Sequence, residues 1–277
     1  FCGDFLAHIA ETGNIQADIV SKNEPQYHFL QYKQDGDYQV TRPYNSDLLL
    51  QGGAFEASAK NFLDILKSAR TIDAPNSAVR QVLNKVTYTL QQAIGLALDA
   101  LPAGKANKAR KLNGDLFERL VRLILNEMGV SCRSGVVQIP VVVRGRQKFT
   151  MSYQHDLIVE MEHQIKLIGS VKTSSKDRLD KIFIDKFLYN KLTETAVPHI
   201  AVFLNDVQRK KTSKEGQYGT NPTFLPGHFK GYTVKLNPLD GVYYCDIHKN
   251  MKTEKILRKQ IQTFDCLLLN DIWRLIK

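Results

Sequence analysis

The sequence predicts an α/β (α+β) fold, in which a mixed central β-sheet is flanked by helices and preceded by a largely helical N-terminal region. Three observations lead to this prediction. Apolar residues recur three and four positions apart through much of the first hundred residues, β-like segments follow an amphipathic helix in the middle of the chain, and helical and strand-like segments alternate after them. A chain of 277 residues is also long enough to bury a sizeable core.

The N-terminal region covers residues 1–104 and is expected to be mostly helical. Apolar residues such as Phe62 and Leu66 fall on one side of a predicted helix. A short strand pair is expected around the turn signal Asp35-Gly36-Asp37. The predicted elements are a helix over residues 1–20, two strands within 27–40, and helices over 55–71 and 79–101.

Turn-forming and basic residues then suggest a linker. Pro102 and Gly104 accompany a basic run from Lys105 to Lys111, and proline and glycine are typical of chain breaks between helices. We therefore place a domain boundary after residue 104, so that the second domain covers residues 105–277.

The second domain is expected to contain the sheet. Its first helix is strongly amphipathic and precedes Gly129, which is typical of a helix end. Ser174 and Asp177 fit a capping box at the start of a later helix. The predicted elements are a helix over 114–128, strands over 136–143, 149–161 and 164–171, a helix over 176–192, a buried strand over 199–204, a polar loop over 208–231, strands over 232–235 and 242–247, and a helix over 253–276.

The charge balance points to a polyanionic partner. The chain carries a net charge of +10 and has a sequence pI of about 9.3, and phosphate contacts supply most of the non-specific affinity for nucleic acids. The longest apolar runs, such as residues 136–143, are too short to span a bilayer. No signal peptide is visible, so we expect a cytoplasmic protein without membrane association.

The cysteines predict reduced thiols. Cys2, Cys132, Cys245 and Cys266 form no Cys-x-x-Cys pair and are irregularly spaced, which argues against a disulfide framework. Cys245 together with His248 would make half of a zinc site, but the sequence offers no second half.

Two residues suggest a hydrolytic site. Asp156 lies where a polar stretch becomes a strand, and Lys172 ends the next strand. If these strands are antiparallel neighbours, the Asp156 carboxylate and the Lys172 amine come close together, and Ser170 shares a sheet face with Lys172. A carboxylate with a backbone carbonyl can hold Mg²⁺, and a lysine beside them can position or deprotonate a water molecule. This is the minimum equipment for phosphodiester hydrolysis.

On these residues, the segment from Gly114 to Leu204 resembles the PD-(D/E)xK nuclease superfamily, and type II restriction endonucleases in particular. In that motif an acid begins the signature, and a second acid lies two positions before the lysine. This chain departs from the motif twice, because Gln154-His155 replaces the usual proline region and Ser170 occupies the place of the second acid.

One branch of the superfamily has Ser-x-Lys followed by a basic helix start, and its missing acid has moved onto that helix. This branch includes enzymes that cut CCGG-type and CCWGG-type sites. The stretch from Ser170 through Lys172 to Arg178 resembles it. The resemblance implies Asp185 as the relocated acid, with Asp180 as the competing candidate.

Glu118 is the other residue that the resemblance singles out. The helix before the nuclease sheet contributes a carboxylate in many members, and Glu118 borders the apolar face of the corresponding helix here. The alternative is an exposed glutamate beside Arg119 or Arg122. The implied Mg²⁺ ligands are Asp156, Asp185, Glu118 and a carbonyl near Val171, with Lys172 activating the attacking water.

The resemblance implies a type II restriction endonuclease from a prokaryote. Such an enzyme cuts double-stranded DNA with Mg²⁺ at a specific sequence, leaves 5′-phosphate and 3′-hydroxyl ends, and acts as a homodimer, to which the N-terminal region would add dimer or DNA contacts. The alternatives are a structure-specific repair or recombination nuclease of the same fold and a non-catalytic DNA-binding protein. Basic residues expected to contact DNA are Lys176, Arg178, Arg144, Arg146, Arg209, Lys210 and Lys211.

Overall fold

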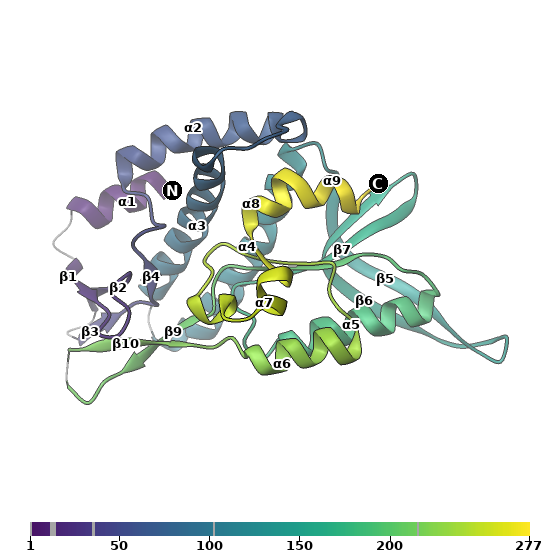
Figure 1. Cartoon of the computed structure of the whole chain (residues 1–277). Coiled ribbons are helices and arrows are strands. Elements are labelled where there is room, and N and C mark those ends of the chain that lie inside the picture. The colour runs from purple at the N-terminus through teal and green to yellow at the C-terminus, as the bar shows by residue number, and fades with distance from the viewer. Residues whose placement is uncertain (1, 12–14, 35–36, 102, 215) are drawn as a thin grey trace.

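A six-stranded mixed β-sheet forms the centre of the molecule (Figure 1). The computed structural model describes residues 2–11, 15–34, 37–101, 103–214 and 216–277. The first three strands along the chain pair antiparallel, and the pairs after them are parallel. In spatial order the strands are β12 (Ile261–Thr263), β11 (Gly241–Tyr244), β8 (His199–Phe203), β7 (Gln164–Lys172), β6 (Arg146–Met161) and β5 (Cys132–Val143). The predicted fold class is confirmed.

Helices cover both faces of this sheet (Figure 1). The main core lies on one face, where Phe117 and Val121 of α4 (Ala106–Glu127) pack against Leu157 and Leu167. The same core includes residues of α2 (Gly52–Ser68) and α3 (Ser77–Asp99). Apolar residues on both sides of residue 104 therefore share one core.

A second core lies on the opposite face. Phe183 of α5 (Leu179–Thr193) packs there with Ala201 and Phe203 of β8. Ile200 and Val202 of the same strand belong to the main core, because side chains alternate between the faces of a strand. The short helices α6 (Pro226–Gly231) and α7 (Lys255–Gln260) also cover this face.

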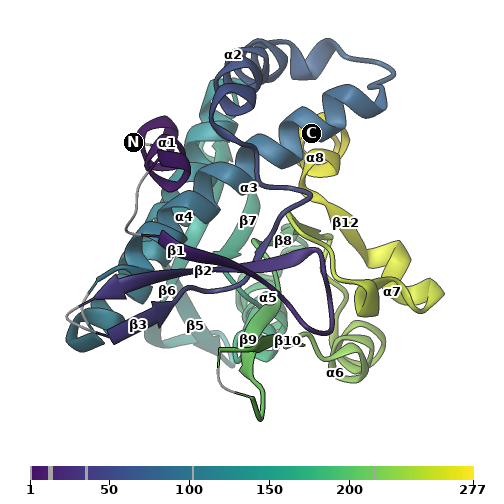
Figure 2. The same ribbon diagram turned by 90° about the vertical axis from the view of Figure 1, so that its left-hand side faces the viewer.

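The N-terminal region adds a small antiparallel sheet. After α1 (Cys2–Glu11) it contains β1 (Ile15–Val20), β2 (Tyr27–Gln34), β3 (Asp37–Val40) and β4 (Tyr44–Asn45). A separate hairpin of β9 (Val207–Lys211) and β10 (Tyr218–Pro222) lies beside it (Figure 2). The Lys22 amide donates a hydrogen bond to the Tyr218 carbonyl, and the Arg209 guanidinium donates to the Val40 carbonyl.

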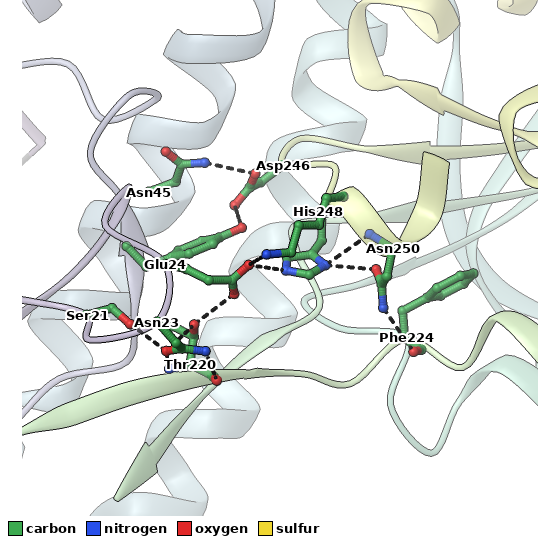
Figure 3. A network of polar contacts seen from close by, with 11 residues as sticks. Ser21, Asn23, Glu24, Asn45, Thr220, Phe224, Asp246, His248 and Asn250 are labelled. Carbon is green, nitrogen blue, oxygen red and sulfur yellow. Dashed lines mark hydrogen bonds and ion pairs between the residues drawn. The ribbon is translucent and has the colours of Figure 1, made fainter. Parts of the chain in front are cut away.

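A buried polar network joins the small sheet to the large one (Figure 3). The Glu24 carboxylate lies 2.8 Å from His248 Nε2 and accepts a hydrogen bond from the Thr220 hydroxyl. The Asp246 carboxylate accepts hydrogen bonds from Tyr27 and Asn45, and burial raises its pKa to about 6. His248, which the sequence offered as half of a zinc site, thus has the Glu24 carboxylate as its partner.

Most predicted elements are confirmed, including the three central strands and the helices over 55–71 and 79–101. Gly129 follows α4 with a φ of 82°, the left-handed conformation expected after a helix end. No described helix is long and apolar enough to cross a membrane. The turn residues 35–36 and Pro102 lie outside the described residues.

Several predictions outside the three central strands are wrong. Only part of residues 1–20 is helical, because β1 pairs with β2. The expected polar loop over 208–231 contains β9, β10 and α6, and residues 232–235 form a helical turn instead of a strand. Pairing with other parts of the chain, which local sequence patterns do not reveal, determines the new strands.

The predicted C-terminal helix and two helix starts also differ. Residues 253–276 are interrupted by β12, because Ile261 is buried where this strand pairs with β11. The basic run up to Lys111 forms the first turns of α4 and not a linker. The capping box is wrong, because the Ser174 hydroxyl donates to Asp206, and α5 begins after Arg178.

Candidate active site

An irregularity in strand β6 determines where Asp156 lies. His155 pairs with Gly135 and Ile158 with Arg133, so two residues of β6 lie opposite one residue of β5. His155 contacts the α5 side of the sheet, whereas Leu157, two positions later, belongs to the core on the α4 side. Such a β-bulge redirects side chains. Asp156 lies within this bulge, between His155 on the α5 side of the sheet and Leu157 on the α4 side.

The strands β6 and β7 separate at the same point. Their last pair in this direction is Leu157 with Gly169. The Val171 amide instead donates a hydrogen bond to the Asp156 Oδ2 atom, at 2.9 Å. Arg122 of α4 donates to the Asp156 carbonyl, at 2.8 Å. Both backbone and side chain of Asp156 are therefore held in place.

Asp156, Lys172 and Glu118 form one cluster, called the catalytic cluster below because it is the candidate catalytic site. The Lys172 Nζ atom lies 2.6 Å from Asp156 Oδ2 and 2.9 Å from Glu118 Oε1. Asp156 comes from β6, Lys172 from the end of β7 and Glu118 from α4. The side chains are 14%, 32% and 22% exposed, respectively. Solvent can therefore reach a site that is otherwise largely enclosed.

The electrostatics of the cluster leave negative charge only partly compensated. Burial raises the pKa of Glu118, and the Asp156 carboxylate adds to this rise although the Lys172 hydrogen bond opposes it. Burial lowers the pKa of Lys172, but the two carboxylates outweigh burial and raise it. Two carboxylates around one ammonium group favour additional positive charge.

The donor set fits a hard divalent cation such as Mg²⁺. Two carboxylates converge on one point, and carboxylate oxygens are preferred Mg²⁺ ligands. In the part of the chain that the structure describes, no group of three or more acidic, histidine or cysteine side chains is preassembled as a metal site. Because Mg²⁺ usually keeps several water ligands, two carboxylates are compatible with its binding.

The predicted relocated acid, Asp185, has a partner outside this cluster. Its carboxylate is 2.6 Å from Lys181 Nζ, one helical turn earlier on α5. Burial lowers the pKa of His155 on β6, and the charge of Asp185 opposes this effect. Asp180 is exposed. Among the described residues, no hydrogen bond or ion pair joins Asp185 to Asp156 or Lys172.

The basic residues predicted to contact DNA lie on three surfaces. Arg144 and Arg146 are exposed at the turn of the β5–β6 hairpin, which projects from the molecule (Figure 1). Lys176 and Arg178 are exposed between β7 and α5. The remaining three, Arg209, Lys210 and Lys211, are exposed on β9.

Arg209 differs from the other predicted contacts. Its guanidinium donates hydrogen bonds to the Val40 and Thr41 carbonyls and lies over the Tyr218 ring. It therefore helps to attach the β9–β10 hairpin to the small sheet.

Arg122 and Asp206 are two residues near the site that sequence reasoning did not select. The sequence suggests Arg122 only as a neighbour of Glu118. Its position one helical turn after Glu118 on the same helix face was the available signal. Asp206 follows β8 and accepts hydrogen bonds from the segment after Lys172. No local motif marks Asp206.

Comparison with solved structures gives the fold a name. The chain superposes on the type IIP restriction endonuclease Kpn2I with a TM-score of 0.73, over 99% of this chain and 88% of that one. This is the restriction-endonuclease fold. Sequence identity to Kpn2I is 16%, so the similarity establishes the restriction-endonuclease fold and not the reaction.

Other comparisons add less. The restriction endonuclease PspGI, solved in complex with substrate DNA, matches with 12% identity and a TM-score of 0.44, over 80% of this chain and 88% of that one. No protein-family model and no curated protein sequence matches the chain. Within the restriction-endonuclease fold, the catalytic cluster lies where β6 and β7 diverge beside α4.

Proposed function

We propose that this protein is a type II restriction endonuclease. It cuts both strands of DNA at a specific sequence with Mg²⁺ and leaves 5′-phosphate and 3′-hydroxyl ends. The observation that carries the proposal is the catalytic cluster, in which Asp156 and Glu118 converge on Lys172 within a restriction-endonuclease fold. Carboxylates with a lysine beside them suit phosphodiester hydrolysis.

In the proposed mechanism, Asp156 and Glu118 hold Mg²⁺, with Asp185 and the Val171 carbonyl as further candidate ligands. Bound Mg²⁺ supplies Lewis-acid polarisation of the scissile phosphate and lowers the pKa of an attacking water. Lys172 orients and activates this water, and its positive charge also favours the pentacovalent phosphate. Arg122 and the Val171 amide keep Asp156 in position.

The proposed substrate is a duplex bound by the exposed basic residues. Arg144 and Arg146 would contact one part of the DNA, and Lys176 and Arg178 would contact the backbone or bases next to the cluster. Lys210 and Lys211 extend this surface along β9. Because both strands are cut, we propose that the enzyme acts as a two-fold symmetric homodimer, which analytical ultracentrifugation would show as a dimer mass.

Plasmid digestion tests the proposed function. The parent protein with Mg²⁺ should produce discrete fragments, and mapping their ends gives the recognition site and the end chemistry. Lys172→Ala and Asp156→Ala should each reduce cleavage by about 10²–10³-fold or more, whereas Lys166→Ala on the same strand as Lys172 should cleave normally.

Other digestion patterns would favour the alternative functions. Cleavage confined to branched or damaged DNA would indicate a structure-specific nuclease. DNA binding without Mg²⁺-dependent cleavage would indicate a non-catalytic DNA-binding protein. Full activity of Lys172→Ala would contradict the assignment of the site.

A further inference from the structure

A deeply buried carboxylate lies just after strand β8, outside the catalytic cluster. Asp206 is 1% exposed. Its oxygens accept hydrogen bonds from the side chains of Ser174, Ser175, Thr223 and Tyr244 and from the Ser175 amide, at 2.5 to 3.3 Å. Burying a carboxylate is costly unless donors surround it. The donors and Asp206 therefore hold one another in place.

Most of these donors belong to the segment that follows Lys172. The Ser174 hydroxyl, the Ser175 hydroxyl and the Ser175 amide supply three of the five hydrogen bonds. Pairing between β7 and β8 ends just before this point, with the Asn205 amide donating to the Thr173 carbonyl at 3.4 Å. Beyond this point, hydrogen bonds to Asp206 take the place of strand pairing in holding residues 174 and 175.

Ser175 also connects Asp206 to the start of α5 through hydrogen bonds. It is buried, and its carbonyl accepts hydrogen bonds from the amides of Arg178 and Leu179, at 3.0 and 3.1 Å. The turn between them includes Asp177 with a φ of 56°, a left-handed conformation that a residue other than glycine adopts only where its surroundings hold it. The shape of this turn therefore depends on the anchor at Ser175.

The residues that the anchor presents are basic and exposed. Lys176 and Arg178 are exposed on either side of Asp177, whereas Ser175 and Asp206 are buried. Long basic side chains lose much conformational entropy when they bind, so a fixed backbone beneath them improves affinity. A buried anchor under an exposed basic turn is an arrangement suited to binding phosphate groups.

We propose that Asp206 is a positioning residue for DNA binding. Through Ser174 and Ser175, it fixes the turn from which Lys176 and Arg178 contact the duplex next to the catalytic cluster. This inference rests on the proposed function, because it takes DNA as the ligand of these two basic residues.

Two single variants remove one hydrogen bond each from the same Asp206 oxygen. Ser175→Ala removes the bond on the side of the basic turn, and Tyr244→Phe removes the bond on the side of the core. Binding of a fluorescein-labelled duplex without divalent ions is the readout. We expect Ser175→Ala to weaken binding by about three- to tenfold, a typical effect of one hydrogen bond, and Tyr244→Phe to stay within about twofold of the parent.

Variants of Asp206 itself give a larger effect. Asp206→Ala should weaken duplex binding by about tenfold or more, and Asp206→Asn should restore most of it, because its carbonyl can still accept the Ser175 amide. Hydrogen exchange of the free protein should become faster for residues 173–179 in Ser175→Ala and not in Tyr244→Phe. If Asp206→Ala does not fold, the comparison of duplex binding by Ser175→Ala and Tyr244→Phe tests the positioning role.

Equal weakening by Ser175→Ala and Tyr244→Phe, in a parent that binds and cuts DNA, would overturn the positioning role alone. A parent that neither binds nor cuts duplex DNA would overturn the proposed function and the positioning role together. The two failures are therefore distinguishable.

Discussion

Glu118 is the residue at which the charge of the catalytic cluster is least balanced. Burial and the Asp156 carboxylate raise its pKa, and Lys172, the cation with which it pairs, is shared with Asp156. The same imbalance that disfavours the charged form of Glu118 would favour a bound cation. In the proposed mechanism, Glu118 would therefore help to attract the metal ion.

Glu118→Gln should weaken the response to Mg²⁺. We expect the Mg²⁺ concentration for half-maximal cleavage to rise by about tenfold or more, because one carboxylate ligand is lost, with partial recovery at high Mg²⁺. Glu127→Gln, on the same helix but exposed, is the matched control. An unchanged Mg²⁺ titration for Glu118→Gln would remove Glu118 from the metal site.

His199 gives the stability of the protein a pH dependence. Burial lowers its pKa to about 4, from an ordinary value of 6.5. His199 therefore binds a proton below about pH 6.5 in the unfolded chain, but only below about pH 4 in the folded chain. The contribution of His199 to stability therefore rises with pH through this window and falls as the pH drops through it, by about 3 kcal/mol in total.

Replacing His199 tests this origin of acid sensitivity. His199→Phe should make the slope of the free energy of unfolding against pH less positive between about 4 and 6.5, because the contribution of His199 is lost while Asp246 still titrates there. His228→Gln, at an exposed position, should leave the curve unchanged. Urea denaturation at several pH values makes the comparison, and parallel curves for parent and His199→Phe would contradict it.

Strand β7 illustrates how elements position the site. Gly169 precedes the catalytic end of this strand and lies between its neighbours β6 and β8. A Cβ atom at Gly169 would lie 2.9 Å from Leu157 Cδ2 and 3.2 Å from Ile200 Cγ1. The close approach of these strands therefore requires glycine, and the packing below the catalytic cluster depends on it.

Gly169→Ala should destabilise the protein by about 1–3 kcal/mol, because overpacking displaces Leu157 or the strand. Gly114→Ala is the contrasting change, since nothing lies within 4 Å of its new Cβ atom and alanine favours the interior of α4 by about 0.5–1 kcal/mol. Urea denaturation should show these opposite signs. An unchanged free energy of unfolding for Gly169→Ala would mean that Leu157 repacks without cost.

Charge is divided unevenly over the whole molecule. Residues 1–104 contain eight lysine and arginine residues against eleven acidic ones, a net charge of −3, and residues 105–277 contain thirty against seventeen, a net charge of +13. The excess of positive charge therefore lies entirely in the part that contains the catalytic cluster. Phosphate contacts are expected from that part.

The salt dependence of DNA binding tests this division. Arg144→Ala together with Arg146→Ala should reduce the slope of log affinity against log salt by about 2, close to one for each lost phosphate contact. Lys60→Ala together with Lys67→Ala, both exposed on α2, should leave the slope unchanged. Equal slopes for the parent and both double variants would exclude the hairpin as a phosphate contact.

Long periodic segments and part of the candidate site were predictable from the sequence. The apolar period of three and four residues determined α2, α3 and α4, and the run of apolar residues determined β8, because burial of those faces dominates their stability. Asp156 and Lys172 were recognisable as a candidate pair from the neighbouring strands that carry them, whereas the family resemblance singled out Glu118. Their distances in the structure agree with that expectation.

Only the tertiary structure decided the features that depend on distant partners. β12 exists because Ile261 reaches the edge of β11, and β1 exists because it pairs with β2. Arg122 and Asp206 became relevant once folding brought them to Asp156 and Ser175. Local propensity is worth only tenths of a kcal/mol for each residue, whereas pairing and burial are worth more, so contacts between distant segments override it.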